Sequence, residues 1–224
     1  MNVCLIGNGI STLILATVLA NRNVKVSIYG EHLPKKSFST RTLGVSKNNF
    51  DYLKKENINI EKRSWKVNRI KIFNEVRNNK EILNFDSGNN EIFFIIKYSE
   101  FFNLLYKKLK KNKFIKQYKI KNLSFFNSII NEKDNYDLVI NFDVKNIISK
   151  KFFFKRYEKD YKTSAFTSLI KHDECNNKTA RQIFTKFGPL AFLPCSNQKT
   201  SIVFSILDQN KIISDKKIQE LILN

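Results

Sequence analysis

The residues at the start of the chain whose types and spacing could do chemistry are two glycines, Gly7 and Gly9, directly after the apolar run Val3–Ile6. Glycines at such a turn let the backbone approach a ligand closely. The helix that follows presents free N–H groups and the positive end of its dipole, a combination that suits a pyrophosphate. We therefore expect a dinucleotide site with contacts from Gly7, Gly9, Ile10, Ser11 and Thr12.

The turn needs a strand before it and a helix after it, and the sequence supplies both. Val3–Ile6 is a short apolar run, residues 10–21 have a long apolar helical pattern, and residues 24–29 alternate as a strand does. These elements form a β-α-β unit, which places the glycines at the carboxyl end of its first strand.

The glycine pattern departs from the dinucleotide fingerprint Gly-x-Gly-x-x-Gly at two points. Thr12 replaces the third glycine, and we expect it to hold the helix slightly away from the strand. An acid that binds a ribose hydroxyl is expected about 20 residues further on. Gly30 stands there instead, so Glu31 is the nearest candidate. An ordinary β-α-β turn that binds nothing is the alternative.

Composition limits the class of protein. The chain has 224 residues, room for one large domain or two small ones, and 42% of them are hydrophobic. No apolar run reaches the roughly 20 residues of a membrane span, and no basic segment of a secretory signal precedes the first strand. Three scattered cysteines are too few for a disulfide framework or a zinc site. We expect a cytoplasmic protein, with peripheral contact to the inner membrane as an option.

The net charge of +20 resembles that of a nucleic-acid-binding protein. Of the 40 basic residues, however, seven are arginine and 33 are dispersed lysines, whereas arginine is the residue of bidentate phosphate recognition. Lys, Asn, Ile and Phe are abundant together, as in an AT-rich coding sequence. We therefore favour a solvated basic surface over specific nucleic-acid binding, and a general attraction to anionic membranes remains compatible with it.

Further along, the pattern predicts a polar loop over 30–46 and a buried parallel strand over 136–143 that ends in Asp143. Ser99 is expected to cap a helix that runs to Lys110. The other predicted strands are 67–73, 81–85, 92–96, 164–170, 180–185 and 201–207, and the other predicted helices are 48–56 and one starting at Ser214. His32 and His172 are isolated, and for His172 we expect a surface role rather than a catalytic one.

Four segments together resemble the FAD-dependent ring hydroxylases of ubiquinone biosynthesis, which are aromatic flavin monooxygenases of the p-hydroxybenzoate-hydroxylase fold. The first is the Gly7/Gly9 turn, and the second is Arg41–Ser46, similar to the family's Arg-Thr-x-Ala-Leu-Ser segment. The third is the strand ending in Asp143, similar to the one that leads into the family's Asp-Gly motif. The fourth and most specific is Gly188–Pro194, close to the family's Gly-Pro-Leu-Ala-Leu-Leu-Pro.

The resemblance implies an α/β fold: a Rossmann-like FAD-binding domain over 1–66 and 91–150, and an inserted antiparallel β-sheet substrate domain over 67–90 and 151–224. It implies that Arg41 and Asp143 join the FAD site and that Leu190 and Phe192 line an apolar substrate pocket. Plain core packing is the alternative for Leu190 and Phe192. The implied chemistry is reduction of FAD by NAD(P)H, followed by O2-dependent hydroxylation of a polyprenylated aromatic ring, without a metal.

The chain departs from this family in lacking its later Gly-Asp and Pro-x-x-Gly-Gln-Gly-x-Asn segments. We therefore expect a truncated or split hydroxylase whose isolated chain binds FAD weakly or not at all. Three alternatives stay open: a non-catalytic scaffold of a quinone-biosynthesis complex at the membrane, a basic nucleic-acid-binding protein, and an NAD-binding oxidoreductase of another family.

Overall fold

The computed structural model describes residues 1–30, 40–75, 80–120, 136–153, 155, 157–207 and 220. The chain divides into two units, Met1–Lys66 with Glu91–Tyr157, and Val67–Asn90 with Glu158–Asn224. The second boundary between the units follows residue 157. The sequence predicts this boundary after residue 150. We describe each unit by itself.

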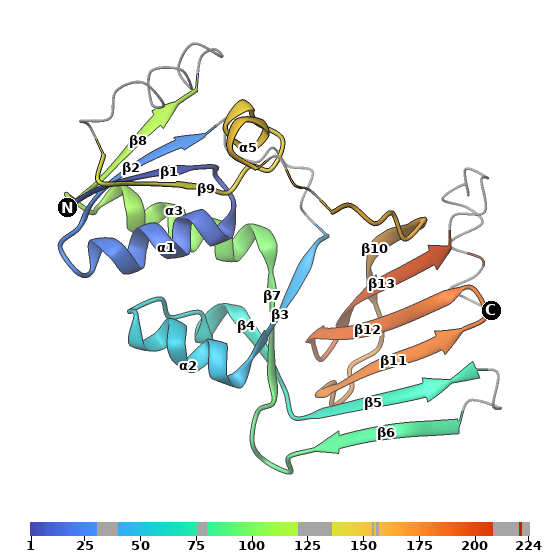
Figure 1. Ribbon diagram of the computed structural model, residues 1–224. Coiled ribbons are helices and arrows are strands. Elements are labelled where there is room, and N and C mark those ends of the chain that lie inside the picture. Colours follow the sequence, from blue (N-terminus) through green and yellow to red (C-terminus); the bar gives the residue numbers. More distant parts are fainter. Residues whose placement is uncertain are drawn as a thin grey trace. The chain divides into compact units, whose positions relative to one another are not determined.

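The first unit is built on a parallel sheet with the order β8-β2-β1-β9. Its strands are β1 (Asn2–Ile6), β2 (Lys25–Gly30), β8 (Ile115–Lys119) and β9 (Leu138–Asn141). β1 pairs in parallel with β2 on one side and with β9 on the other. The predicted β-α-β unit is confirmed, because α1 (Ile10–Ala20) links β1 to β2 and lies along one face of the sheet, as Figure 1 shows.

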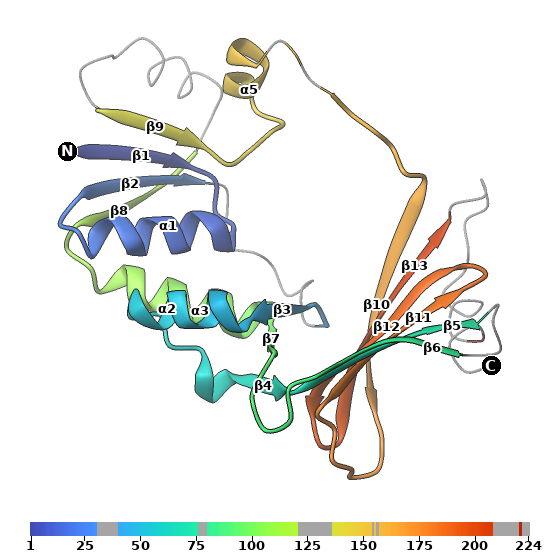
Figure 2. The same ribbon diagram turned by 60° about the horizontal axis from the view of Figure 1, so that its bottom comes forward.

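Three helices build the main core of this unit: α1, α2 (Lys47–Lys55) and α3 (Tyr98–Lys110). Figure 2 shows α1 and α3 on the same side of the parallel sheet. Apolar residues at helical spacing in α3, such as Phe101, Leu105 and Leu109, pack with β-strand residues such as Leu5 and Ile28. Burying these side chains is the main favourable contribution to folding of the unit.

A second, three-stranded sheet of the first unit has the order β3-β7-β4. Its strands are β3 (Thr42–Ser46), β4 (Ser64–Val67) and β7 (Phe93–Lys97), and a short 3₁₀ helix, η2 (Glu61–Arg63), precedes β4. The predicted loop over 30–46 is therefore wrong at its end, because Thr42–Ser46 pairs antiparallel with β7. The cap of α3 is also corrected: Lys97, not Ser99, is the N-cap residue, and its side chain makes no capping hydrogen bond.

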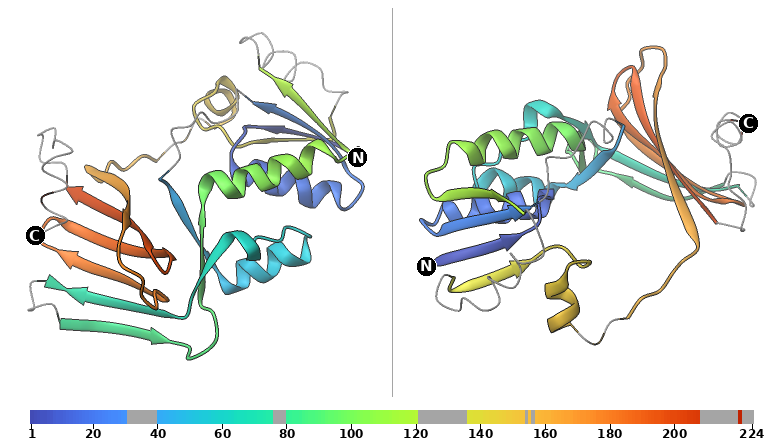
Figure 3. Two further views of the ribbon diagram at one scale, coloured as in Figure 1. Left: turned by 180° about the vertical axis from the view of Figure 1, so that it is seen from behind. Right: turned by 90° about the horizontal axis from the view of Figure 1, so that it is seen from above.

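β9 was predicted to be buried, and the structure corrects this. β9 is an edge strand of the described sheet, and Leu138 and Val139 are 43% and 38% exposed. Their neighbours on β1 are the fully buried Val3 and Cys4. Beyond β9 lies the short helix α5 (Ile147–Phe152), visible from above in Figure 3, and its Ile148 packs against Cys4 and Ile6 on the face opposite α1.

The second unit is a six-stranded sheet with the order β10-β13-β12-β11-β5-β6. Its strands are β5 (Arg69–Asn74), β6 (Lys80–Asp86), β10 (Thr163–Lys171), β11 (Thr179–Thr185), β12 (Gly188–Ser196) and β13 (Lys199–Leu207). All neighbouring pairs are antiparallel except β11 and β5, which run parallel. The predicted strand 67–73 is interrupted, because β4 ends at Val67 and β5 begins at Arg69.

Glycine at position 188 is required by the close approach of two strands. Gly188 has φ +137°, and a Cβ atom there would lie 2.0 Å from the carbonyl oxygen of Ser205 on β13. The glycine that begins the Gly188–Pro194 segment is thus explained by the packing of its own sheet.

Among the described residues, no helix is long and apolar enough to cross a membrane. The predicted helix from Ser214 falls outside the described residues, apart from Glu220, which is helical.

Candidate functional site

The turn after β1 depends on the absence of a side chain at Gly7. This residue has φ +129°, and its N–H donates to the carbonyl oxygen of Tyr29 over 2.7 Å. A Cβ atom on Gly7 would lie 3.0 Å from the Cβ of Phe142, which follows β9. The carboxyl ends of β1, β2 and β9 therefore converge closely at this turn.

Gly9 forms the N-terminal end of α1 and leaves it open. It is the N-cap residue, has no side chain to cap the helix, and no acidic residue lies in the first turn. The first intrahelical bond is donated by Leu13 to Gly9, so the preceding N–H groups of Ile10, Ser11 and Thr12 have no acceptor within the helix. A Cβ atom at Gly9 would meet none of the described residues within 4 Å. This end of α1 can accept an anion.

Thr12 lies beneath the turn, in the place of the third glycine. It is fully buried, and its hydroxyl has no hydrogen-bond partner in the part of the chain that the structure describes. A buried hydroxyl without a partner is costly. Thr12 is therefore a polar group at the turn that a ligand atom could satisfy.

The end of β2 has no acidic side chain among the described residues, since Glu31 lies outside them. Gly30 ends the strand, and a Cβ atom there would lie 2.9 Å from the Cβ of Asn8. The side chain of Asn8 thus covers the position where a ribose-binding acid was expected.

Asp143 lies in the turn after β9, next to Phe142 and therefore beside the glycine turn. Its carboxylate accepts a hydrogen bond from the N–H of Lys145 over 2.9 Å, and its carbonyl oxygen accepts one from the hydroxyl of Ser149 over 2.8 Å. Asp143 shapes its own turn, while its side chain remains exposed.

Arg41 directly precedes β3. Its guanidinium carbon lies 5.0 Å from the ring centroid of Tyr98, and its carbonyl oxygen accepts the N–H of Tyr98 over 2.9 Å. A guanidinium held over an aromatic ring keeps its hydrogen-bonding edge available. Arg41 is exposed and belongs to the same unit as the glycine turn.

The order of the parallel sheet makes the glycine turn a candidate binding site. From β1 the chain continues to β2 and β8 on one side, whereas β9 lies on the other. Ligands of open α/β sheets bind outside the carboxyl ends of the strands at such a switch point. Gly7, Gly9 and Thr12 lie here, together with the turn that contains Asp143.

The two expected substrate residues are on β12 of the second unit. Leu190 is 6% exposed and belongs to a cluster with Ile202, Phe204 and Ile206, whereas Phe192 is half-buried against the same cluster. Cross-strand neighbours include Leu190 with Phe204. Leu190 is thus a core residue of the sheet, and Phe192 is the more accessible of the two.

Sequence reasoning missed two residues at the turn, Asn8 and Phe142. Asn8 is part of the Gly7–Gly9 run, so its position was a usable signal. No sequence signal marks Phe142, because its contact with Gly7 arises only when β9 pairs with β1.

No family model and no curated protein matches the chain. Solved structures do. PqsL from Pseudomonas aeruginosa in complex with 2-aminobenzoylacetate aligns with a TM-score of 0.71 and 12% identity, covering 100% of this chain and 64% of that one. The p-nitrophenol 4-monooxygenase PnpA from Pseudomonas putida aligns with a TM-score of 0.72 and 11% identity, covering 98% and 60%.

HpxO from Klebsiella pneumoniae, complexed with FAD and uric acid, aligns with a TM-score of 0.72 and 12% identity, covering 100% of this chain and 60% of that one. The fold is that of the FAD monooxygenases. This chain spans about 60–64% of the length of these three FAD-monooxygenase-fold structures.

The residues of this chain fit the pyrophosphate end of an FAD molecule. The fit rests on three observations: the lack of a side chain at Gly7, the uncapped N-terminal end of α1 at Gly9, and the Thr12 hydroxyl, which has no hydrogen-bond partner among the described residues. In an FAD-monooxygenase fold, these are the groups that would face the diphosphate.

Proposed function

We propose that this chain provides the FAD-binding and substrate-binding parts of an FAD-dependent aromatic-ring monooxygenase. The observation that carries the proposal is the open N-terminal end of α1, reached through a glycine turn at the switch point of a parallel sheet. The fold shared with FAD-bound HpxO supports it. The bound flavin would supply the redox chemistry, with NAD(P)H as the electron donor.

The protein's own contribution in this proposal is binding and orientation. The N–H groups of Ile10, Ser11 and Thr12 would hold the diphosphate, and the positive end of the α1 dipole would offset its charge. Arg41, held over Tyr98, would supply a fixed positive charge near the cofactor. Asp143 would offer a carboxylate oxygen to a hydroxyl of the cofactor from the turn beside Gly7.

We propose a polyprenylated quinone precursor as the substrate. The support is the Gly188–Pro194 segment and the apolar face of β12, where Phe192 is partly accessible. An apolar aromatic ring with a long hydrocarbon tail suits such a face, because burial of its surface drives binding.

The experiment is a titration of the ¹⁵N-labelled chain with FAD, followed by backbone NMR shifts, which detect weak binding residue by residue. Shifts concentrated at Gly7, Gly9 and Thr12 are expected. Shifts confined to lysine-rich surface segments would contradict the site.

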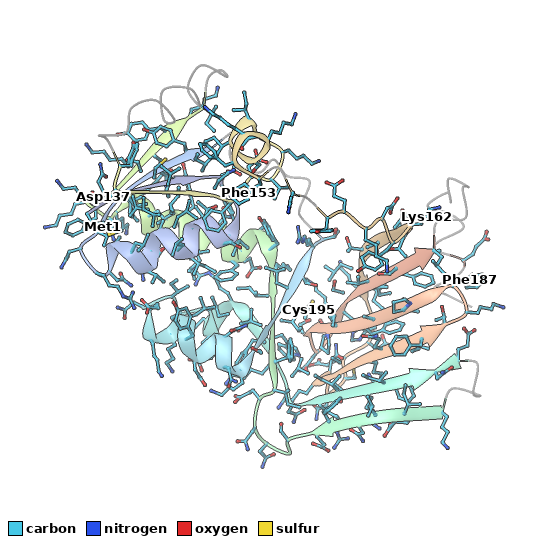
Figure 4. All side chains as sticks on the ribbon, viewed as in Figure 1. Met1, Asp137, Phe153, Lys162, Phe187 and Cys195 are labelled. Carbon is cyan, nitrogen blue, oxygen red and sulfur yellow. The ribbon has the colours of Figure 1, made fainter. Side chains whose placement is uncertain are left out.

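We also propose contact with an anionic membrane surface. Around α5, Phe152 and Phe153 are 53% and 67% exposed and Tyr157 is 97% exposed, next to Lys150 and Lys151. Figure 4 labels Phe153 at the end of this helix. Aromatic rings insert at the headgroup level, and each lysine near an anionic surface adds roughly 1 kcal/mol of attraction.

The membrane contact is tested by co-sedimentation with vesicles of phosphatidylserine and phosphatidylcholine. Binding should require phosphatidylserine, and should weaken in the variant with Phe152, Phe153 and Tyr157 all changed to Ser. Tyr52→Ser, at a 48% exposed position on α2, is the matched control. Equal sedimentation of all three proteins would contradict a membrane role for this segment.

A further inference from the structure

The ribose end of the candidate site differs from the usual dinucleotide site. A carboxylate normally stands at the end of the second strand and accepts a hydrogen bond from a ribose hydroxyl. Here the strand ends in Gly30, whose backbone has no left-handed φ that would exclude a side chain. The glycine is therefore not required by the backbone angle of β2.

The side chain of Asn8 explains why position 30 is a glycine. A Cβ atom on Gly30 would lie 2.9 Å from the Cβ of Asn8 and 3.4 Å from its Cγ. A contact under 3 Å between carbon atoms is repulsive, so an acid at position 30 and the present side chain at position 8 exclude each other. The amide group of Asn8 lies over the strand end that the acid would occupy.

We propose that Asn8 is the ribose-binding residue of this site and takes the part of the missing acid. The inference rests on the proposed function. An asparagine amide has both an acceptor oxygen and donor N–H groups, so it can bond to a ribose hydroxyl as a carboxylate does. It does so without charge. Asn8 is partly exposed and stands between the two glycines that admit the diphosphate, one residue from each.

The test uses ¹⁵N NMR titrations of the full chain with ADP, which carries the ribose and diphosphate, and with 2′,3′-dideoxy-ADP, which lacks both hydroxyls. Asn8→Ala should weaken ADP binding about three- to tenfold, the worth of one net hydrogen bond, and leave dideoxy-ADP binding unchanged. A purely structural role of Asn8 would weaken both ligands equally. Asn48→Ala, on the exposed face of α2, is the matched control.

A second arm separates Asn8 from Glu31. Glu31→Gln should leave ADP binding within about twofold of the unchanged protein. If Glu31→Gln instead abolishes the preference for ADP over dideoxy-ADP while Asn8→Ala preserves it, the acid binds the ribose and the inference is overturned.

A compensating pair of changes tests the mutual exclusion. Gly30→Asp alone should weaken ADP binding, because its side chain meets Asn8. Asn8→Gly with Gly30→Asp should recover the preference for ADP over dideoxy-ADP, since the pair restores the usual acid. If the double variant prefers ADP over dideoxy-ADP no more than Gly30→Asp alone does, the mutual exclusion of the two side chains is contradicted.

The outcomes also distinguish the inference from the proposed function. If the unchanged chain shows no shifts at the turn with either FAD or ADP, the proposed function fails and the inference fails with it. If the unchanged chain binds both FAD and ADP, and Asn8→Ala binds them with the same affinities, only the inference about Asn8 is overturned.

Discussion

The hydroxyl oxygen of Thr12 lies 3.2 Å from the place that a Cβ atom on Gly7 would take. The two residues thus occupy complementary space, with the bulk of Thr12 accommodated by the bare backbone of Gly7. A third glycine in place of Thr12 would leave more room at this turn. The turn stays tight without a third glycine because the Thr12 side chain fills the space that a side chain on Gly7 would need.

Gly7 and Gly9 should respond differently to alanine. Gly7→Ala introduces a side chain at φ +129° against Phe142 and Thr12, and should destabilise the first unit by about 2–3 kcal/mol. Gly9→Ala has open space and φ −77°, so the fold should be retained. Its methyl group would stand where the diphosphate approaches, and FAD affinity should fall about tenfold, the equivalent of 1.4 kcal/mol. Urea unfolding and FAD titration measure the two effects.

Thr12→Val tests the buried hydroxyl. The change replaces a hydroxyl without a described partner by a methyl group of similar size, so the free protein should be unchanged or up to about 1 kcal/mol more stable. If the hydroxyl contacts the cofactor, FAD affinity should fall at the same time. A valine variant that is markedly less stable would show that the hydroxyl has a partner.

Gly188→Ala should be among the most damaging single changes in the second unit. The added Cβ would lie 2.0 Å from the carbonyl oxygen of Ser205, so β12 and β13 must separate locally. We expect a loss of about 2–4 kcal/mol in urea unfolding. Gly88→Ala is the matched control, because Gly88 also has a positive φ, +63°, but its Cβ would meet nothing within 4 Å. Equal losses in the two variants would contradict the clash.

The Cys4 thiol should be chemically silent in the folded protein. Burial raises its pKa from 9.0 to about 12, so it stays protonated at pH 8, whereas Cys175 is exposed. An aromatic disulfide reagent should label Cys175 quickly and Cys4 only after unfolding. Because the folded pKa is the higher one, stability due to neutral Cys4 is complete below pH 9 and is lost as the pH rises toward 12. Cys4→Ser should remove that alkaline loss.

The Arg22–Glu56 pair should make the first unit sensitive to acid. Arg22 donates two hydrogen bonds to the carboxylate of Glu56, over 2.9 and 2.7 Å, which link the end of α1 to the end of α2. These bonds lower the pKa of Glu56 below its ordinary value of 4.5. The stability from this pair is therefore present above pH 4.5 and lost as the pH falls through the lowered pKa.

Glu56→Gln should accordingly lower the urea midpoint at pH 7 and have progressively less effect below pH 4.5. Lys47 and Asp51 form an exposed pair within α2, and Asp51→Asn serves as the control with a smaller effect at pH 7. A pH-independent difference between Glu56→Gln and the unchanged protein would rule out the ionised pair as its source.

The β-α-β unit at the start of the first unit was predictable because its signals are local. The apolar run before Gly7, the helical pattern of residues 10–21 and the alternation in β2 each depend on neighbours in the sequence. The strands β5, β6, β10, β11 and β13 were predicted from local patterns for the same reason.

Long-range pairing decided what local patterns could not. Thr42–Ser46 looks polar enough for a loop, yet hydrogen bonding to Phe93–Lys97 makes it a strand. The apolar residues of β9 predict a buried strand, but its place at the sheet edge leaves Leu138 and Val139 exposed. The place of each of these two strands in its sheet depends on residues far away in the sequence.

The sequence by itself determined that a glycine turn joins a strand to a helix at the start of this chain, because steric freedom and helix periodicity are local properties. Only the tertiary structure decided that β9 packs Phe142 against Gly7 and that the end of β2 carries Gly30 beneath Asn8. These contacts join residues distant in sequence, and they exist only when β1, β2 and β9 are paired in register. The chemistry of the ribose end therefore depends on that pairing.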